Sequence, residues 1–430
     1  MRRFIRGVCL SAVLVASLTS SEAQEQAQAP KPLTWEEVKA RFEVNNPTLR
    51  AGEIGIDESK ANEITAFLRP NPQAFIGVDQ IGHNSQGPFS EATLTTSLSY
   101  LHERRHKREL RLESAKKATD IAISSQDDLD RTLLFTLRGA FVGALQAKAV
   151  LRVVLDNLNY WDQVLKISRE RFRAGDIAQI DLDRLELERV QFESDVQTAE
   201  VNLRTAKIQL LMLLNDRTPV DEFDVLGLFE YNGQLAALDD FRKTALENRP
   251  DLRAAFQAVD KAKTDHQLAV ANGSTDPTIN FDAGFPGVSQ DYVNYTPFLR
   301  EYVGFGFSIP LRIFDRNQGE KLRTQLDIDR NQKFFDATQA QVFNDVDSAY
   351  AMVNSNLILL RPYKAKYLDL AVRVRETVRF AYEHGGASLL DFISAENDYR
   401  SVQLNYVNLV GSYLIAAAQL NLAVGREVIQ

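Results

Sequence analysis

The chain has 430 residues, which exceeds one ordinary domain and leaves two domains or one elongated repeat as the starting options. Hydrophobic residues make up 44% and charged residues 25%, values that argue against a disordered chain and a helical membrane protein. The formal net charge is −8, and this acidic balance argues against binding of nucleic acid.

The first 23 residues have the pattern of a secretory signal peptide. Three arginines among the first six residues precede an apolar stretch, Val8 to Leu18, and the small-x-small cleavage site Ser21-Glu22-Ala23. The alternative is a short membrane anchor, but the stretch is well below the ~20 apolar residues of a spanning helix. The only cysteine, Cys9, lies inside it, so we expect no disulfide, thiolate metal site or lipid-attachment cysteine in the exported chain.

No stretch after the signal peptide is predicted to be a transmembrane helix. Export without such a helix leaves a soluble periplasmic protein, a secreted protein or a β-barrel of the outer membrane. The strand-like segments later in the chain discriminate among these classes.

An internal duplication organises the chain. The segment Asn45 to Ala51 resembles Asn248 to Ala254 at an offset of 203 positions. Two glycine turns, at Gly175 and Gly385, are offset by 210 positions, and each lies 74 positions after a matching leucine. Chance similarity of short motifs does not preserve such spacing, so we expect two structural repeats.

The two repeats are predicted to have the same order of elements. Each begins with a short helix that starts at a proline, Pro47 or Pro250, and continues with two strands, a very long helix, a glycine turn and a returning helix. Thr34 and Glu37 form a capping box that starts the first helix of the chain. The predicted boundaries are a signal peptide at 1–23, a first repeat at 24–214, a linker at 215–237, a second repeat at 238–425 and a tail at 426–430.

Long helical hairpins are predicted over 105–214 and 316–424. Their apolar residues follow a 3-4 spacing that indicates coiled-coil packing, at positions such as Leu137, Trp161, Leu165, Phe172, Leu185, Phe192, Phe392, Tyr413 and Leu420. A helix of roughly 70 residues spans ~100 Å and cannot bury its own apolar stripe. The short and returning helices together match its length, so we expect them to stack end to end beside it. An ordinary periplasmic hairpin protein is the alternative interpretation of this periodicity.

Four strand-like segments, at about 73–81, 91–101, 278–287 and 300–311, have the length of tilted strands that cross a bilayer. In the fourth, Val303, Phe305, Phe307 and Ile309 alternate with small or polar residues, which is the pattern of an outer-membrane barrel. Four strands cannot close a barrel, and unpaired backbone groups at open edges cost several kcal/mol each in lipid. Closure therefore requires several chains.

Loops are predicted between the strands of each repeat, at 82–90 and 288–299. Aromatic residues in and after the second loop are candidates for an interfacial girdle: Tyr292, Tyr295, Phe298 and Tyr302. Local packing of these rings is the alternative.

These features together resemble the TolC-like outer-membrane efflux protein family. The residues that carry the resemblance are the helix starts at Pro47 and Pro250, the strand end Ser308-Ile309-Pro310-Leu311, and the two turns, Phe172 to Ile177 with Asp181 and Tyr382 to Ala387 with Asp391. The resemblance covers nearly the whole exported chain. It implies an α+β, mainly α fold and a homotrimer, with a 12-stranded β-barrel in the outer membrane of a Gram-negative bacterium above a periplasmic tube of 12 helices.

The resemblance also implies a function and partners. Such a channel passively conducts cargo from the periplasm to the exterior, and its tip docks a periplasmic adaptor protein that links it to an inner-membrane pump. The implied docking residues are those of the two tip turns: Ala174, Gly175, Asp176, His384, Gly385, Gly386, Ala387 and Ser388. The structural alternative is that these glycines only permit tight turns with positive φ. Many relatives carry an acylated N-terminal cysteine, which this chain lacks, so attachment would rest on the barrel alone.

A closed tip needs side chains that reach inward from the helices beside the turns. The candidates for such a periplasmic gate are Arg379, Glu383, Asp391 and Glu396. The alternative for each of them is a solvated face of the coiled coil.

The sequence predicts neither an enzyme nor a cofactor site. His102 and His106 have metal-ligand spacing on a helix, but the basic residues around them oppose cation binding, so we expect a basic collar and no metal site. No phosphate loop, thiol nucleophile or convergent carboxylate pair is present, and the energy for transport is expected from a partner. The rival function is a periplasmic adaptor, which should have one hairpin instead of two. The sequence does not specify the cargo.

Overall fold

The structure is a computed structural model that describes residues 32–79, 93–286 and 301–429. The predicted signal peptide and both predicted loops lie outside these residues, as do the girdle candidates Tyr292, Tyr295 and Phe298. The fourth girdle candidate, Tyr302, begins a strand and is exposed.

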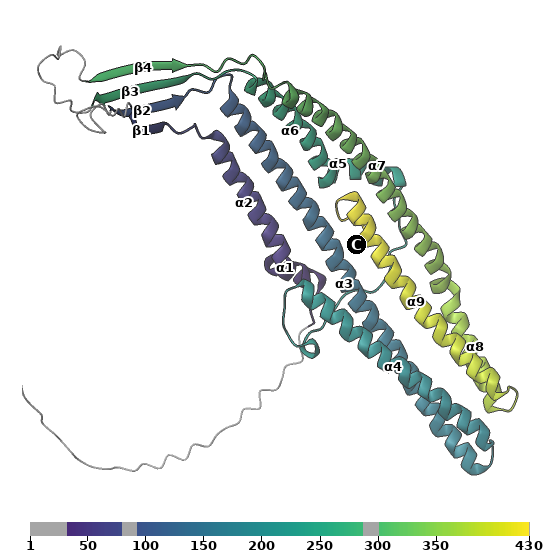
Figure 1. Ribbon diagram of the computed structural model, residues 1–430. Helices are drawn as coiled ribbons and strands as arrows, with labels where there is room; N and C mark the ends of the chain where they lie inside the picture. The colour runs from purple at the N-terminus through teal and green to yellow at the C-terminus, as the bar shows by residue number, and fades with distance from the viewer. Residues whose placement is uncertain (1–31, 80–92, 287–300, 430) are drawn as a thin grey trace, which may run out of the picture.

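The molecule is elongated, with a β-sheet at one end and the turns of two helical hairpins at the other (Figure 1). The first half contains α1 (Trp35–Asn45), α2 (Pro47–Phe67), β1 (Gln73–Asp79), β2 (Thr93–Leu101), α3 (Lys107–Ala174) and α4 (Gln179–Leu213). The second half contains α5 (Leu238–Asn248), α6 (Pro250–Asn272), β3 (Thr278–Pro286), β4 (Tyr302–Ser308), α7 (Gln318–Pro362), α8 (Leu368–Glu383) and α9 (Leu389–Val424). The order of elements therefore matches between the halves, apart from a break between α7 and α8.

The described strands form one antiparallel sheet in the order β1-β2-β3-β4. The register pairs Leu98 of β2 with Phe281 of β3, and Phe281 with Phe305 of β4. The prediction that the fourth strand reaches residue 311 was wrong, because β4 ends at Ser308, where its pairing with β3 stops. Pro310, two residues later, has no N–H to donate to a ladder.

The helix starts agree with the local sequence signals. The predicted capping box is confirmed, because the backbone N–H of Thr34 donates to Glu37 Oε2 (2.9 Å) and that of Glu37 to Thr34 Oγ1 (3.4 Å). The prolines Pro47 and Pro250 occupy the first positions of α2 and α6, where a missing N–H costs nothing.

The predicted end-to-end stacking of helices is confirmed. Both α2 and α4 pack along α3, while α6 and α9 pack along α7, and α3 also contacts α6 and α9. Four described helices therefore lie side by side at each level along the bundle. Near the sheet they are α2, α3, α6 and α7, and toward the turns they are α4, α3, α9 and α7 or α8 (Figure 1).

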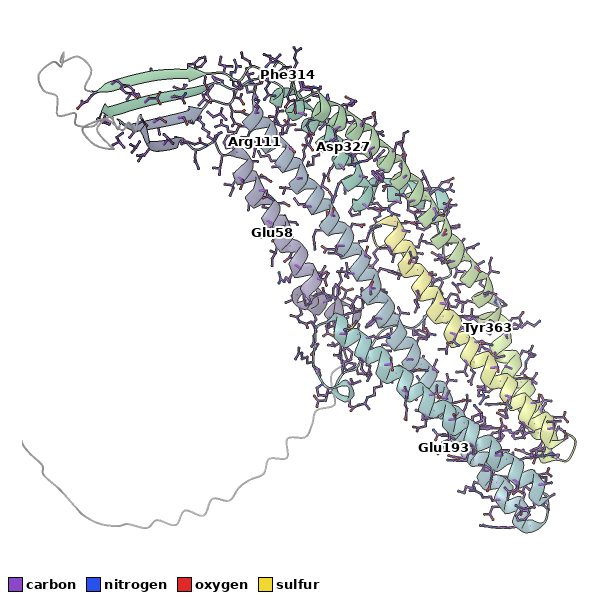
Figure 2. The ribbon with its side chains drawn as sticks, viewed as in Figure 1. Glu58, Arg111, Glu193, Phe314, Asp327 and Tyr363 are labelled. Atoms are coloured by element: carbon purple, nitrogen blue, oxygen red, sulfur yellow. The ribbon has the colours of Figure 1, made fainter. Side chains whose placement is uncertain are left out.

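The second long helix is not continuous, which corrects the prediction of two equivalent long helices. Whereas α3 is unbroken over 68 residues, α7 ends at Pro362 and a π-helical segment, Tyr363–Tyr367, separates it from α8. Proline cannot donate a backbone hydrogen bond and its ring crowds the preceding turn, which explains a break at this position. Tyr363, labelled in Figure 2, marks the break.

The ends of the stacked helices meet near the middle of the molecule, where each repeat forms an equivalent hydrogen bond. Asn46, just before α2, donates from Nδ2 to the carbonyl of Leu213 at the end of α4 (3.0 Å). Arg249, just before α6, donates from Nη1 to the carbonyl of Ala423 near the end of α9 (3.3 Å). Each bond satisfies a terminal helix carbonyl that has no partner within its own helix. We call these two contacts the latches.

Among the described residues, four clusters of buried apolar residues hold the helices together, the smallest of them, Val154, Val196 and Ala199, lying between α3 and α4. The first belongs to the first repeat and includes Phe42, and the second belongs mainly to the second repeat and includes Tyr413. The third lies near the hairpin turns and contains Trp161, Leu182 and Phe392, so it joins the two repeats. The coiled-coil pattern therefore identified most core positions correctly, but the prediction for Phe172 was wrong, because this residue beside the turn is 36% exposed.

Two described helices, α3 and α9, contain an 18-residue window that is long and apolar enough to cross a membrane. The prediction that no such stretch follows the signal peptide was therefore wrong by length and composition. Both windows lie within longer helices that pack against each other, and a core helix passes the same test.

Candidate functional site at the sheet and at the tips of the hairpins

The sheet has one apolar face and one polar face. Directly paired residues share a face, and one row across the strands consists of Ala74, Leu98, Phe281 and Phe305. A row on the opposite face consists of Ser99, Asn280 and Gly306. The predicted alternation is confirmed, and it suits a sheet with lipid on one side and water on the other.

The two hairpin turns share one backbone geometry. Gly175 has φ +84° and Gly385 has φ +75°, in the left-handed region that favours glycine. Beyond each glycine, a backbone N–H reaches back five residues: Asp176 to the carbonyl of Arg171 (2.9 Å) and Gly386 to that of Ala381 (2.7 Å). Both glycines thus have the structural role of helix C-caps.

The second turn also carries a capping box. Ser388 precedes α9 and its Oγ donates to Asp391 Oδ2 (2.7 Å), while the backbone N–H of Asp391 donates to Ser388 Oγ (3.1 Å). The hydrogen bond from Ser388 holds the pKa of the Asp391 carboxyl below its usual value. Asp391, a gate candidate, is therefore engaged in stabilising the turn.

The tip residues form the exposed end of the helical bundle. All eight predicted docking residues are exposed except Ala387, which is half-buried. The hairpins contact each other just behind the turns, where the Arg171 guanidinium lies 5.4 Å from the Tyr382 ring centroid and Tyr382 stacks on Phe392 (5.0 Å). The two turns therefore form the tip of one packed unit (Figure 1).

The four gate candidates occupy different environments. Arg379 forms ion pairs with Glu376 and, at 4.0 Å, with Glu383, all three on α8. Asp391 belongs to the capping box, and Glu396 is buried between helices. The structure thus joins Arg379 and Glu383 and does not bring the other two to them as a single cluster.

Glu396 is only 5% exposed and accepts a hydrogen bond from the Tyr160 hydroxyl of α3 (3.0 Å). Burial raises the pKa of the Glu396 carboxyl to about 7. The charged and titratable groups around it are Tyr160 on α3, Arg375, Glu376 and Arg379 on α8, and Tyr399 on its own helix. Sequence reasoning missed Tyr160 and Arg375, because the contacts join positions far apart in the chain.

The layer around Glu396 contains several buried polar atoms that lack a hydrogen-bond partner among the described residues. These atoms, on α3, α8 and α9, are Asn157 Nδ2, Arg375 Nε, Arg379 Nε, Asn397 Oδ1 and Gln403 Oε1. An unpaired buried polar group costs about 1–3 kcal/mol. In addition, no residue of α8 is buried in the chain. The parts of the hairpins near the turns are therefore packed less tightly than the middle of the molecule.

Solved structures similar to this chain share its fold. Crystallised CusC matches with a TM-score of 0.75 at 16% identity, covering 91% of this chain and 92% of that chain. The open-state MtrE outer membrane channel of Neisseria gonorrhoeae matches with a TM-score of 0.73 at 17% identity, covering 92% and 89%.

Sequence comparisons agree with the fold. The cobalt-zinc-cadmium resistance protein CzcC of Cupriavidus metallidurans is 21% identical over 404 residues, 93% of this chain and 91% of CzcC. Nodulation protein T of Rhizobium leguminosarum bv. trifolii is 24% identical over 329 residues, 73% of this chain and 67% of that protein. Residues 242–426 match the family model of the outer membrane efflux protein. Over these residues the chain is similar to the outer membrane efflux protein family.

The match of the family model lies in the second repeat of this chain. The first repeat has the same elements in the same order and an equivalent latch. The rival interpretation as an adaptor required one hairpin, whereas the chain has two, α3–α4 and α8–α9. The comparisons do not favour that alternative.

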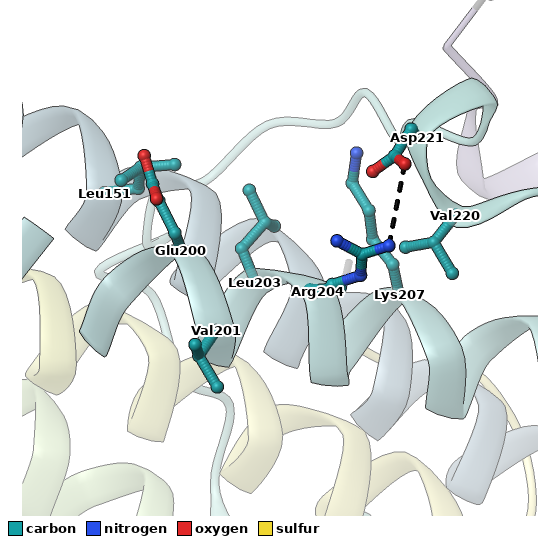
Figure 3. Close-up of a pocket in the computed structure, with 8 residues that line it drawn as sticks. All are labelled: Leu151, Glu200, Val201, Leu203, Arg204, Lys207, Val220 and Asp221. Carbon is teal, nitrogen blue, oxygen red and sulfur yellow. Dashed lines mark ion pairs between the residues drawn. The ribbon is translucent and has the colours of Figure 1, made fainter. Parts of the chain in front are cut away.

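A shallow groove lies where α4 meets the segment that follows it (Figure 3). Its apolar lining comes from Leu151, Leu203 and Val220, and Arg204 pairs with Asp221 across 3.6 Å. Because this ion pair joins α4 to the segment after it, we interpret the groove as a structural junction between the two.

The two histidines with metal-ligand spacing do not share a helix, which corrects that part of the prediction. His102 follows β2 and His106 precedes α3, which begins at Lys107. Among the described residues, no group of three or more histidine, cysteine or acidic residues could hold a metal ion.

We expect Glu396→Gln to remove a pH dependence of stability. The carboxyl binds its proton more tightly in the folded protein (pKa about 7) than in the unfolded chain (4.5), so stability falls as pH rises from 4.5 through 7. At pH 8 the variant should be more stable than the wild type by on the order of 2–3 kcal/mol, and at pH 4 the two should be similar. Apparent melting temperatures at fixed protein concentration test this, with exposed Glu383→Gln as the control. A variant less stable than the wild type at pH 8 would contradict it.

Proposed function

We propose that this chain is one of three identical subunits of an outer-membrane channel in a tripartite efflux system. The channel passively conducts cargo from the periplasm to the exterior, and most of each chain lies in the periplasm. The observation that supports the proposal best is the four-stranded sheet, which has an apolar face and two unpaired edges, β1 and β4.

Closure of the sheet requires neighbouring subunits. In a bilayer, the unpaired N–H and C=O groups along β1 and β4 would each cost several kcal/mol. If β4 of one subunit pairs with β1 of the next, three subunits give a closed barrel of 12 strands, an even number that is usual for such barrels. Four helices side by side per subunit give 12 helices in the same assembly.

The tip is proposed to dock the adaptor protein that links the channel to an inner-membrane pump. The exposed residues of both turns, from Ala174 to Asp176 and from His384 to Ser388, are the available surface at this end. Of the four gate candidates, we propose Arg379 and Glu383 for the gate, because they lie on α8, the most weakly packed helix. Asp391 and Glu396 are engaged in the turn and the core.

The relative CzcC is named for resistance to cobalt, zinc and cadmium. Divalent metal cations are therefore the first cargo class to test for this channel. A deletion strain grown with cobalt, zinc, cadmium and a drug panel discriminates metals from organic compounds. Sensitivity to drugs alone would contradict a metal cargo.

The central experiment is cell fractionation followed by an unheated denaturing gel of the outer-membrane fraction. The proposal expects the protein in that fraction and a band at three times the subunit mass that collapses on heating. A monomer confined to the soluble periplasm would overturn the channel.

A single charge at the tip should strongly reduce efflux without affecting assembly. Ala174→Asp places a carboxylate on the exposed end of α3, where it opposes docking of a complementary surface. We expect at least about a tenfold loss of efflux, corresponding to about 1.4 kcal/mol or more of docking energy. The matched control is Ala61→Asp, on an exposed position of α2 near the sheet end. Equal effects of the two substitutions, at equal trimer levels, would contradict docking at the tip.

A further inference from the structure

The connection between β2 and α3 departs from its counterpart in the other repeat. Residues 102–108 read His-Glu-Arg-Arg-His-Lys-Arg, whereas residues 312–318, at the same offset of 210, read Arg-Ile-Phe-Asp-Arg-Asn-Gln. We call residues 102–108 the basic turn. Both segments connect a strand to a long helix, so any cation of the basic turn that does not hold this connection together is a candidate for a further role.

The backbone of the basic turn is strained where its cations are placed. Arg105 has φ +58° and His106 has φ +54°, whereas the counterpart contains only Asn317 at φ +62°. Asparagine tolerates this left-handed conformation, while such conformations cost of order 1–3 kcal/mol at other residues. Two consecutive strained residues, both bearing basic side chains, indicate that the position of these side chains matters.

Some cations of this region are used to hold the fold. Lys107 is buried and donates to Asp276 Oδ2 (2.6 Å), Arg104 bonds the backbone and hydroxyl of Thr275, and Arg111 pairs with Glu103. These contacts join the start of α3 to the start of β3. They leave other cations of the region unused.

Three basic side chains have no ion pair or hydrogen bond among the described residues. They are Arg69, between α2 and β1, and His102 and Arg105 of the basic turn, and all three are exposed. Arg69 and His102 line a pocket of about 220 Å³ together with Tyr100, Lys107 and Arg108. Glu103 and Glu109 also line it, and their carboxylates are paired with Arg111 and Arg108. This volume suits a compact group such as a phosphate, and not a whole lipid or drug.

The pocket lies on the apolar side of the sheet. Tyr100 pairs with Ile279, which pairs with Phe307, in a row beside that of Leu98, Phe281 and Phe305. Phe67 and Leu68 are exposed in the same region, and the Arg108 guanidinium lies 4.3 Å from the Phe67 ring centroid. Arg111 and Phe314, labelled in Figure 2, mark this boundary between sheet and helices.

We propose that the basic turn and Arg69 bind the phosphate headgroup of an anionic phospholipid. The inference rests on the proposed function, because it requires the sheet to cross a bilayer with its apolar face in lipid. The lipid then belongs to the leaflet on the helical side, with its acyl chains along Phe67 and Leu68. Clustered cations next to an apolar surface attract anionic headgroups in this way, by about fivefold in affinity per arginine.

The test uses the full assembly purified in detergent. It is titrated with phosphatidylglycerol or with phosphatidylethanolamine of the same acyl chains, and native mass spectrometry counts the bound lipid. The wild type should retain phosphatidylglycerol preferentially. Arg69→Gln with Arg105→Gln should reduce its affinity at least tenfold, and 0.5 M salt should also weaken it. The matched control, Arg312→Gln with Arg316→Gln in the other repeat, should leave the preference unchanged.

Equal retention of both lipids, or equal losses in the two double variants, would overturn the lipid site. In either case a trimer in the outer-membrane fraction would leave the channel proposal intact. A soluble monomer would overturn the channel itself, so the two failures are distinguishable. If added inorganic phosphate displaced both lipids from the protein equally, this result would likewise contradict recognition of the anionic lipid.

Discussion

Trp161→Ala should destabilise the lower parts of the two hairpins by about 3–5 kcal/mol, because it empties the centre of the cluster that joins them. The Trp161 side chain is 0% exposed, and its ring stacks on Phe192 (5.0 Å) and Phe392 (6.0 Å). Its Nε1 donates to the carbonyl of Leu185 (3.0 Å). The substitution therefore removes contacts to α4 and α9 at once, and leaves a cavity.

The apparent melting temperature of the purified trimer and the rate of proteolysis near the tip measure the effect. The control is Ile167→Ala, which truncates an exposed side chain on the same helix and should change stability little within the subunit. Trp161→Phe should recover part of the loss, because it restores ring volume but not the hydrogen bond. A Trp161→Ala protein with wild-type melting and protease resistance would show that the cluster does not couple the hairpins.

Much of the fold follows from local sequence signals. The 3-4 spacing of apolar residues identified the long helices and core positions such as Leu137 and Leu420, because helical periodicity is a property of neighbouring residues. Pro47 and Pro250 fixed two helix starts, and the alternation in 303–309 fixed the faces of β4. Preserved spacing between the halves then gave the order of elements.

Two local signals were present in the sequence and were overlooked. Pro362 lies inside the second predicted long helix, where proline breaks the hydrogen-bond ladder, and the structure has a π-helical segment directly after it. Ser388 and Asp391 have the spacing of a capping box. Reading that spacing would have assigned Asp391 to the turn and not to a gate.

Other contacts of the candidate site could not be predicted from a single sequence. Tyr160 and Glu396 are separated by 236 positions, and the latch of Asn46 spans 167. Such pairs depend on how two helices are aligned after folding, which periodicity does not determine. The burial of Glu396 was missed because its charge was taken to indicate a solvated face, although it lies four residues after Phe392 on the apolar stripe.

The other large effect is expected at the latch of the second repeat. Arg249 is buried, its Nε and Nη2 donate to Asp251 (3.0 and 2.7 Å), and its Nη1 donates to Asp345 (2.9 Å) as well as to the Ala423 carbonyl. It thus ties α6, α7 and α9 together at the middle of the molecule. Arg249→Met should cost about 2–4 kcal/mol, because it removes the buried cation that two carboxylates and a carbonyl share.

A second set of variants separates the charge effect from the loss of packing. Adding Asp251→Asn and Asp345→Asn to Arg249→Met removes the unpaired carboxylates and should recover part of the lost stability, as coupled groups do in a mutant cycle. Asn46→Ala, at the equivalent latch of the first repeat, removes a neutral donor and a helix N-cap and should cost only about 1 kcal/mol. Apparent melting temperatures at one protein concentration measure all three. Equal losses at the two latches would contradict a role for the buried ion pairs, since the carbonyl contact is the feature that both latches share.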